Sequence, residues 1–281
     1  MTKIYFLGPE GSNTHLAAEK FEKILNTETE LVPVLNIQHG FNEYLKTPDF
    51  SYLILPLENS IEGTVRETID NIIQNEDETL KIYGEITLDI EHCLIANPDA
   101  QLDTINTVIS HPQAISQCID TLYDLFGNDV KIINSTSTSK ATKLLSEYPN
   151  NVASIANPLC ARIYGKKVLK TNISKVANNK TRFAIINKFN QSESAFTPSR
   201  TAISFSTKNI AGALASVLDV LAYYGINLSH IDSRPSKLKL GEYVFYCELD
   251  TTFENNNLEI ALNKIKNYTN YLKLCGEFFS V

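Results

Sequence analysis

Short apolar runs alternate with amphipathic segments along the first two thirds of the chain. Residues 4–7 form such a run, and beyond a glycine-containing turn Ala17, Phe21 and Ile24 follow at helical spacing. Residues 52–57 form a second apolar run, which also leads into an amphipathic helix. This order of strand, turn and helix predicts an α/β fold, in which ligands bind beyond the carboxyl ends of the strands.

The pattern changes between residues 80 and 96, where a long mixed strand region has no helix before it. We interpret this stretch as the crossing into a second α/β lobe. The apolar runs at 108–110 and 130–133 both lead into polar helix entries. Ser110 and Gln113 have the spacing of a capping box, which predicts a helix start there.

A polar turn opens another apolar strand at residues 178–187. Thr181 brings an uncharged hydroxyl to the mouth of this strand, and Arg182 brings a planar cation suited to carboxylates. Each candidate position also has an ordinary interpretation. Ser12 and Asn59 are residue types common at helix N-caps, Gln117 fits a solvated helix face, and an arginine at a strand end is typical surface chemistry.

A polar linker at residues 188–199 separates this region from the last 80 or so residues. There the periodicity predicts the order strand, helix, strand, strand, helix, strand, which is a ferredoxin-like βαββαβ unit. We therefore expect a catalytic domain at 1–187, with lobe one at about 1–78 and 176–187 and lobe two at about 79–175. A second domain is expected at 200–281.

Composition narrows the function classes. The chain has 281 residues and a formal net charge of -7, which argues against nucleic acid as the main partner, so an anionic ligand must be held by local donors. Five widely spaced cysteines without a Cys-x-x-Cys pair indicate reduced thiols rather than a disulfide framework. With neither a signal-peptide pattern nor a membrane-length apolar run, we expect a cytoplasmic protein.

A series of motifs, in order, resembles one family. The motifs are Gly8-Pro9-Glu10-Gly11-Ser12, Pro56-Leu57-Glu58-Asn59-Ser60, Ser110-His111-Pro112-Gln113-Ala114 with Gln117, Ser135-Thr136-Ser137, Asn179-Lys180-Thr181-Arg182-Phe183, Gly212-Ala213-Leu214, Gly225-Ile226-Asn227-Leu228 and Asp232-Ser233-Arg234-Pro235. The chain resembles the monofunctional bacterial prephenate dehydratases, which carry a C-terminal regulatory module called the ACT domain. It departs from the family pattern at Asn13, where an aromatic residue is usual, and at Asp232, where glutamate is usual.

The resemblance implies a fold, a reaction and partners. The catalytic part is expected to have two α/β lobes, like type II periplasmic binding proteins, with the site in the cleft between them. The reaction is the decarboxylating dehydration of prephenate to phenylpyruvate in L-phenylalanine biosynthesis, with no metal or cofactor. L-phenylalanine is the expected effector, and a homodimer or homotetramer is the expected assembly.

The same resemblance implies roles for individual residues. The catalytic set is Thr181, Glu58, Asn59 and Gln117. The substrate-binding set is Arg182, Ser12, Ser110, Ser135, Thr136, Ser137 and Phe183. The effector-binding set is Gly212, Ala213, Leu214, Asn227, Leu228, Asp232, Ser233, Arg234 and Pro235.

These assignments lead to a mechanistic hypothesis. Arg182 clamps a substrate carboxylate, helix N-termini add backbone N–H donors, and Thr181 hydrogen-bonds the departing hydroxyl. Glu58 is a candidate proton source. Two alternatives stay open, namely an arogenate dehydratase and a non-catalytic amino-acid sensor. The sequence shows no preceding helical segment that resembles a chorismate mutase, so we do not expect a bifunctional enzyme.

Overall fold

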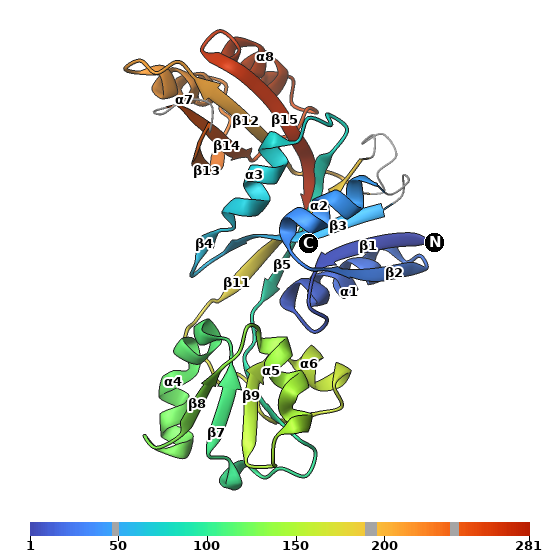
Figure 1. Ribbon diagram of the computed structural model, residues 1–281. Helices are drawn as coiled ribbons and strands as arrows, with labels where there is room; N and C mark the ends of the chain where they lie inside the picture. The colour runs from blue at the N-terminus through green and yellow to red at the C-terminus, as the bar shows by residue number, and fades with distance from the viewer. Residues whose placement is uncertain (47–50, 189–195, 237–241) are drawn as a thin grey trace.

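The computed structural model describes residues 1–46, 51–188, 196–236 and 242–281. Three bodies follow one another in space: lobe two, lobe one and the C-terminal domain, with lobe one in the middle (Figure 1). Their strands form two sheets, one of ten strands and one of five. Within the described residues, no helix is long and apolar enough to cross a membrane.

Lobe one contains the middle of the larger sheet. Its strands are β1 (Thr2–Leu7), β2 (Thr29–Val34), β3 (Ser51–Asn59), β4 (Gly63–Thr64), β5 (Lys81–Asp89) and β11 (Lys180–Asn187). Its helices are α1 (Asn13–Leu25), α2 (Ile37–Leu45) and α3 (Arg66–Gln74). Strands β1, β2 and β3 are parallel, whereas β11 runs antiparallel between β3 and β5.

The crossing into lobe two comes later than the sequence pattern predicts. We expected it near residue 79, but all of β5 pairs in the larger sheet, next to β11. The smaller sheet begins with β6 (Cys93–Ala96). The mixed pattern at 80–96 therefore covers two strands in different sheets, and periodicity alone does not mark the boundary between them.

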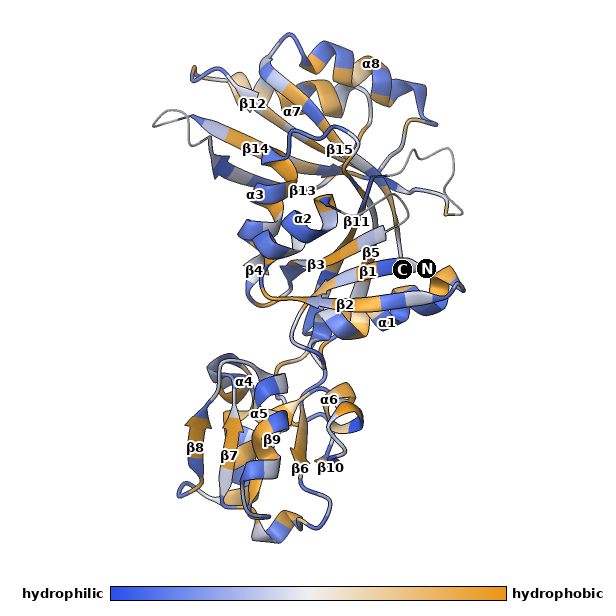
Figure 2. Cartoon of the chain, turned by 45° about the vertical axis from the view of Figure 1, so that its right-hand side comes forward, coloured by the Kyte–Doolittle hydropathy of each residue, from blue (hydrophilic) through white to orange (hydrophobic). Residues whose placement is uncertain are grey.

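Lobe two is built on the five-stranded sheet, in the order β10-β6-β9-β7-β8. The remaining strands are β7 (Thr107–Ser110), β8 (Lys131–Asn134), β9 (Val152–Ala156) and β10 (Lys167–Lys170). Its helices are α4 (Pro112–Phe126), α5 (Thr138–Leu144) and α6 (Pro158–Ile163), with short 3-10 turns at Leu102–Thr104 and Leu145–Glu147. Apolar residues line the strands of this lobe, and polar residues cover the outer sides of its helices (Figure 2).

The C-terminal domain has the expected βαββαβ order. Its elements are β12 (Arg200–Thr207), α7 (Ala213–Tyr223), β13 (Leu228–Pro235), β14 (Tyr243–Leu249), α8 (Asn256–Ile265) and β15 (Thr269–Ser280). The strand order β13-β14-β12-β15 is that of a ferredoxin-like sheet, and it leaves β13 at the edge. Two α/β lobes and a ferredoxin-like domain confirm the predicted fold class.

The last strand joins the two domains. β15 pairs with β12 for most of its length, and its end pairs in parallel with β5 through Phe279 and Ser280. Gly276 lies where the strand meets lobe one, and a Cβ there would come within 2.1 Å of the Ile82 carbonyl oxygen. Any side chain would thus break this approach, so the junction requires glycine.

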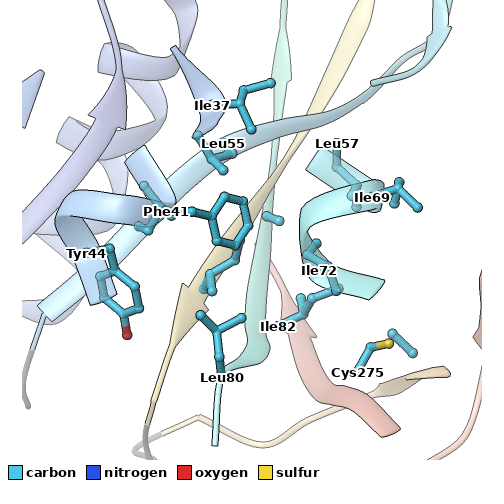
Figure 3. Packing of buried hydrophobic residues seen from close by; sticks show 14 of the residues in the cluster. Ile37, Phe41, Tyr44, Leu55, Leu57, Ile69, Ile72, Leu80, Ile82 and Cys275 are labelled. Atoms are coloured by element: carbon cyan, nitrogen blue, oxygen red, sulfur yellow. The ribbon is translucent and has the colours of Figure 1, made fainter. Parts of the chain in front are cut away.

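A shared hydrophobic core supports the junction. Phe41, Leu55 and Ile72 of lobe one belong to the same buried cluster as Cys275, which lies on β15 (Figure 3). Burial of this apolar surface stabilises the contact between the domains as it stabilises each domain's interior. The C-terminal domain is therefore packed directly against lobe one and is not connected to it by the linker alone.

Candidate active site

A cavity of about 430 Å³ lies between the two lobes. Residues of β3, β11 and the turn before α1 line one wall, and the starts of α4 and α5 line the other. The polar lining residues are Ser12, Asn13, Thr14, Asn59, Glu62, His92, His111, Gln113, Gln117, Thr136, Ser137, Thr138, Ser139, Asn179 and Thr181. No lysine or arginine lines this cavity in the part of the chain that the structure describes.

Thr181 and Asn59 form the centre of the lobe-one wall. They are register partners in β11 and β3, and the Asn59 Nδ2 donates to the Thr181 hydroxyl oxygen at 2.8 Å. The Asn59 amide orientation is fixed, because its Oδ1 accepts from the backbone N–H groups of Ile61 (3.0 Å) and Glu62 (3.1 Å). Thr181 is therefore the acceptor in this contact. Its own hydrogen remains available to a ligand in the cleft.

A chain of amides continues from this pair into lobe two. Asn59 Nδ2 also donates to Asn179 Oδ1 at 2.9 Å, and Asn179 Nδ2 donates to Gln117 Oε1 at 3.0 Å. The Gln117 oxygen also lies 2.9 Å from His92 Nε2. Because an amide oxygen only accepts, His92 carries its hydrogen on Nε2. Gln117 then has its Nε2 as the atom that can donate into the cleft.

Burial favours the neutral form of His92. The residue is 7% exposed, and removal from water lowers the pKa of His92, although its bond to Gln117 opposes this shift. A neutral ring in that tautomer holds the Gln117 oxygen without adding charge.

Three helix N-termini face the same cavity. Ser12, His111 and Ser137 are the N-caps of α1, α4 and α5, and their side chains accept from backbone N–H groups in the first turn of each helix. The other first-turn N–H groups have no partner within the helix, and the helix dipole adds positive potential there. This wall can thus hold anionic groups through backbone dipoles alone.

Apart from Arg182, the residues expected to bind substrate divide into two groups. Ser12, Thr136, Ser137 and Phe183 line the cavity. Ser12 serves there as the N-cap of α1, and its hydroxyl hydrogen is already donated to the Leu7 carbonyl oxygen at 3.0 Å.

Ser110 and Ser135 do not line the cavity, and this corrects the expectation for both. Ser110 is fully buried in β7 and donates to the Ile155 carbonyl oxygen at 2.7 Å. The predicted capping box is also corrected, because His111, and not Ser110, caps α4. The Ser135 hydroxyl is buried and has no hydrogen-bond partner among the described residues.

The structure also corrects the expected positions of Arg182 and Glu58. Adjacent residues of a strand point to opposite faces of the sheet, so Arg182 points away from the cleft into which Thr181 points. Its Nη1 donates to Glu58 at 2.9 Å, and neither residue lines the cavity. An arginine engaged by carboxylates on the far face of the sheet does not clamp a substrate carboxylate in this arrangement. Glu58 is likewise removed from the position of a proton donor.

The two lobes touch beside the cavity. Asn157 Nδ2 in lobe two donates to the Gly11 carbonyl oxygen at 2.9 Å and to Asn13 Oδ1 at 2.8 Å. Gly11 has φ of +79°, and a Cβ there would lie 2.9 Å from both Cys160 Sγ and Ser139 Oγ. The turn that follows β1 is thus in close contact with lobe two, and the cleft is closed on this side.

The expected effector residues belong to α7 and β13 of the C-terminal domain. Gly212 is the N-cap of α7, followed by Ala213, and Leu214 and Leu228 pack against the same domain core. Asn227 Nδ2 donates to Asp250 at 2.6 Å. The segment from Asp232 to Pro235, which includes Ser233, lies on the edge strand β13, where Asp232 is half-buried and Pro235 exposed.

Arg234 is the exception in that group, because it reaches the catalytic domain. Its Nε lies 2.7 Å and its Nη2 3.1 Å from the two carboxylate oxygens of Asp70 on α3. Only 15% of the Arg234 side chain and 18% of the Asp70 side chain are exposed. The last motif of the chain is thereby linked to a helix of lobe one.

Asn179 and His92 are among the cavity residues that were absent from the predicted site. Asn179 belongs to the motif that contains Thr181, so its place in the motif was a usable signal. His92 follows the last strand before lobe two, a position common for site residues, but no spacing pairs it with Gln117. That contact depends on how the two lobes pack.

The fold and the cavity define a two-lobed α/β protein with a cavity between its lobes and a ferredoxin-like domain at its C-terminal end. A family model for prephenate dehydratase matches residues 4–191, and one for the ACT domain matches residues 201–267. The prephenate dehydratase of Methanocaldococcus jannaschii is 36% identical over 279 residues, covering 98% of this chain and 97% of the relative.

Solved structures agree with this assignment. The prephenate dehydratase of Staphylococcus aureus superposes with a TM-score of 0.82 at 28% identity, covering 99% of this chain and 100% of the other. The Arthrobacter aurescens enzyme, a complex with L-Phe, superposes with a TM-score of 0.86 at 25% identity, covering 99% and 90%. The chain belongs to the prephenate dehydratase family, and its activity is that of a hydro-lyase acting on prephenate.

Proposed function

We propose that the cleft between the lobes holds prephenate as a dianion and that Thr181 hydrogen-bonds its departing hydroxyl. The substrate carries two carboxylates, and the N-termini of α1, α4 and α5 offer backbone N–H groups for them. Gln117 adds a side-chain donor from the lobe-two wall. Binding by oriented dipoles suits a cavity whose described lining holds no lysine or arginine, because the dipoles are already in place before the substrate binds.

The reaction breaks two bonds and restores an aromatic ring. The bond from the ring to its carboxylate breaks and releases carbon dioxide, and the electron pair moves through the ring to expel the hydroxyl from the opposite carbon. The departing hydroxide takes up a proton and leaves as water. Aromatisation drives this change, so the protein has to fix the pose and stabilise the leaving group.

One observation carries the role of Thr181. Its oxygen accepts from Asn59 at 2.8 Å, and the amide of Asn59 cannot turn over without losing two backbone bonds. The Thr181 hydrogen is thus directed to an acceptor in the cleft, where the negative charge on the leaving oxygen develops. A threonine hydroxyl is a weak acid, so Thr181 stabilises and orients the leaving oxygen and does not supply the net proton unaided.

The test is turnover of prephenate and of arogenate by the full chain, with formation of phenylpyruvate as the readout for prephenate and formation of L-phenylalanine as the readout for arogenate. We expect turnover of prephenate at a kcat/KM well above that with arogenate. Turnover of arogenate alone would contradict the proposed substrate, and turnover of neither would contradict the catalytic assignment.

We further propose that L-phenylalanine regulates the enzyme through the ACT domain. The sequence signatures at Gly212 to Leu214 and Asn227 to Pro235, together with L-Phe in the related Arthrobacter aurescens structure, support this proposal. Arg234 lies within the second signature and pairs with Asp70 of lobe one, which offers a route from the ligand to the catalytic domain. Phenylalanine then binds a closed, less active state more tightly than the active state, and so shifts the enzyme toward the less active one.

A homodimer or homotetramer in the cytoplasm completes the proposal. β13 is an edge strand of the ACT sheet, and an edge with unpaired backbone groups is suited to pairing with a second copy. All five cysteines are free and buried, as suits a reducing compartment.

Because β15 also pairs with β5, deletion of residues 200–281 would damage the catalytic sheet. Point variants are therefore the appropriate test of regulation.

A further inference from the structure

Arg182 ties the strand that carries Thr181 to two domains. On the face of the sheet away from the cleft, its Nε donates to Glu85 at 2.8 Å, its Nη1 to Glu58 at 2.9 Å and its Nη2 to Glu248 at 2.6 Å. Glu58 is on β3 and Glu85 is on β5, both in lobe one. Glu248 is on β14 of the ACT domain.

The group is enclosed. Only 18% of the Arg182 side chain, 4% of Glu85 and 1% of Glu248 is exposed. Burial acts to lower the pKa of Arg182, but the Glu248 and Glu85 carboxylates outweigh it and raise that pKa above its ordinary value. Charges withdrawn from water need their partners, so these side chains have little freedom to separate.

Further residues of the ACT domain donate hydrogen bonds to the carboxylates of Glu85 and Glu248. Arg200 of β12 donates to Glu85 Oε1 at 3.2 Å, and the Ser280 hydroxyl of β15 donates to the same oxygen at 2.6 Å. The Tyr246 hydroxyl of β14 donates to Glu248 Oε1 at 3.1 Å. Three strands of the ACT sheet thus fix the position of the acceptors that surround one guanidinium.

The strand needs such support at this point. The pairing of β11 with β3 shifts between Arg182 and Phe183, since Arg182 pairs with Glu58 and Phe183 with Pro56, which leaves Leu57 over. A bulge of this kind bends a strand and re-aims its side chains. The extra residue lies on β3, two positions before Asn59, so the pairing beside Thr181 and Asn59 is irregular, and the contacts of Arg182 hold β11 there from the opposite face.

We infer that Arg182 is a positioning residue for Thr181 and that Glu248 makes this positioning depend on the ACT domain. Arg182 touches no substrate. Through the backbone it fixes where the neighbouring hydroxyl lies against Asn59, and a displacement of β14 alters that position. This inference rests on the proposed role of Thr181 and adds to it the route by which the regulatory domain reaches the reacting atoms.

The test compares Arg182→Lys and Glu248→Gln in the full chain, with kcat and KM for prephenate measured well below the melting temperature of each variant. Glutamine keeps the shape of Glu248 and removes its charge. We expect each variant to lower kcat by on the order of tenfold or more and to leave KM within about twofold, as for a misplaced catalytic group. The kcat of the double variant should lie close to that of the less active single variant, since both changes break the same contact between Arg182 and Glu248.

Asp124→Asn is the matched control. It removes an exposed carboxylate paired with Lys175 in lobe two, far from this cluster, and should leave kcat unchanged. A wild-type kcat for Glu248→Gln would overturn the inference, even if Arg182→Lys did not fold. A raised KM at unchanged kcat for Arg182→Lys would also overturn it, because that result indicates contact with substrate. If the wild-type chain did not turn over prephenate, the proposed function would fail instead.

Discussion

The side-chain nitrogen of Asn59 donates to the hydroxyl oxygen of Thr181 across 2.8 Å, and this direction cannot reverse without breaking two backbone hydrogen bonds to Asn59. A neutral amide thus determines which way a neutral hydroxyl points. The arrangement of these two side chains in the lobe-one wall is set by hydrogen-bond direction and not by charge.

Asn59→Asp removes the donor of this bond, together with the donor to Asn179. A carboxylate keeps an acceptor for the N–H groups of Ile61 and Glu62 but has no hydrogen to give Thr181. We expect Thr181 to turn its hydrogen toward the introduced carboxylate and kcat to fall by on the order of a hundredfold, with the fold retained. Steady-state kinetics and circular dichroism check this. Wild-type kcat in Asn59→Asp would show that the direction of this bond is irrelevant.

Gly11→Ala tests the contact between the lobes. At φ of +79° a Cβ is strained, and here it would also lie 2.9 Å from Cys160 Sγ and Ser139 Oγ. We expect the variant to hold the lobes apart and to lower kcat/KM by roughly tenfold or more, as misplacement of site groups does. Gly127→Ala is the matched control, because Gly127 has φ of +77° and no atom within 4 Å of the added Cβ.

The control should lose about 1 kcal/mol of stability from backbone strain and keep its kcat/KM. Equal kinetic losses in the two variants would mean that strain in the turn, and not closure of the lobes, accounts for the effect.

Asp70→Asn tests the link from the ACT domain to α3. In this arrangement the carboxylate of Asp70 occupies the Nε and Nη2 groups of Arg234. If phenylalanine binds Arg234, it competes with the Asp70 carboxylate. Loss of that carboxylate then lowers the phenylalanine concentration needed for half inhibition, by roughly fivefold or more for a coupling above about 1 kcal/mol. Inhibition curves at fixed prephenate measure this shift. An unchanged curve would remove the Asp70–Arg234 pair from the regulatory route.

Stability should fall at mildly acidic pH because of His15. Its Nδ1 accepts from the Gly11 N–H at 3.0 Å, and burial lowers the pKa of His15, with Glu19 acting in the opposite direction. The folded state therefore binds this proton less readily than the unfolded state. The stabilisation is complete above pH of about 6.5 and is lost as pH falls through the lowered pKa, with a slope of up to about 1.4 kcal/mol per pH unit.

Melting temperatures between pH 5 and pH 8 check this prediction. In His15→Asn the amide oxygen can accept from Gly11 and does not titrate, so the melting temperature should fall less with acid than in the wild type. Identical pH profiles for the two proteins would assign the acid sensitivity elsewhere.

The sequence was sufficient for the architecture because the elements are strongly periodic, and the motifs located most of the cleft wall. The sequence was less informative about which groups each side chain meets. Alternation along a strand already implied that Thr181 and Arg182 face opposite sides, but only the long-range pairing of β15 with β5 and the position of Glu248 reveal what Arg182 meets there. His92 was missed for the same reason, since its contact with Gln117 joins segments that no local pattern relates.

The most direct measurement of the central claim is kcat for prephenate in Thr181→Val beside Thr181→Ser. Valine keeps the shape of threonine and removes the hydroxyl, whereas serine keeps the hydroxyl. We predict that kcat falls by on the order of a hundredfold to a thousandfold in Thr181→Val and by no more than about tenfold in Thr181→Ser. Near-wild-type turnover by Thr181→Val, or equal losses in the two variants, would contradict the account.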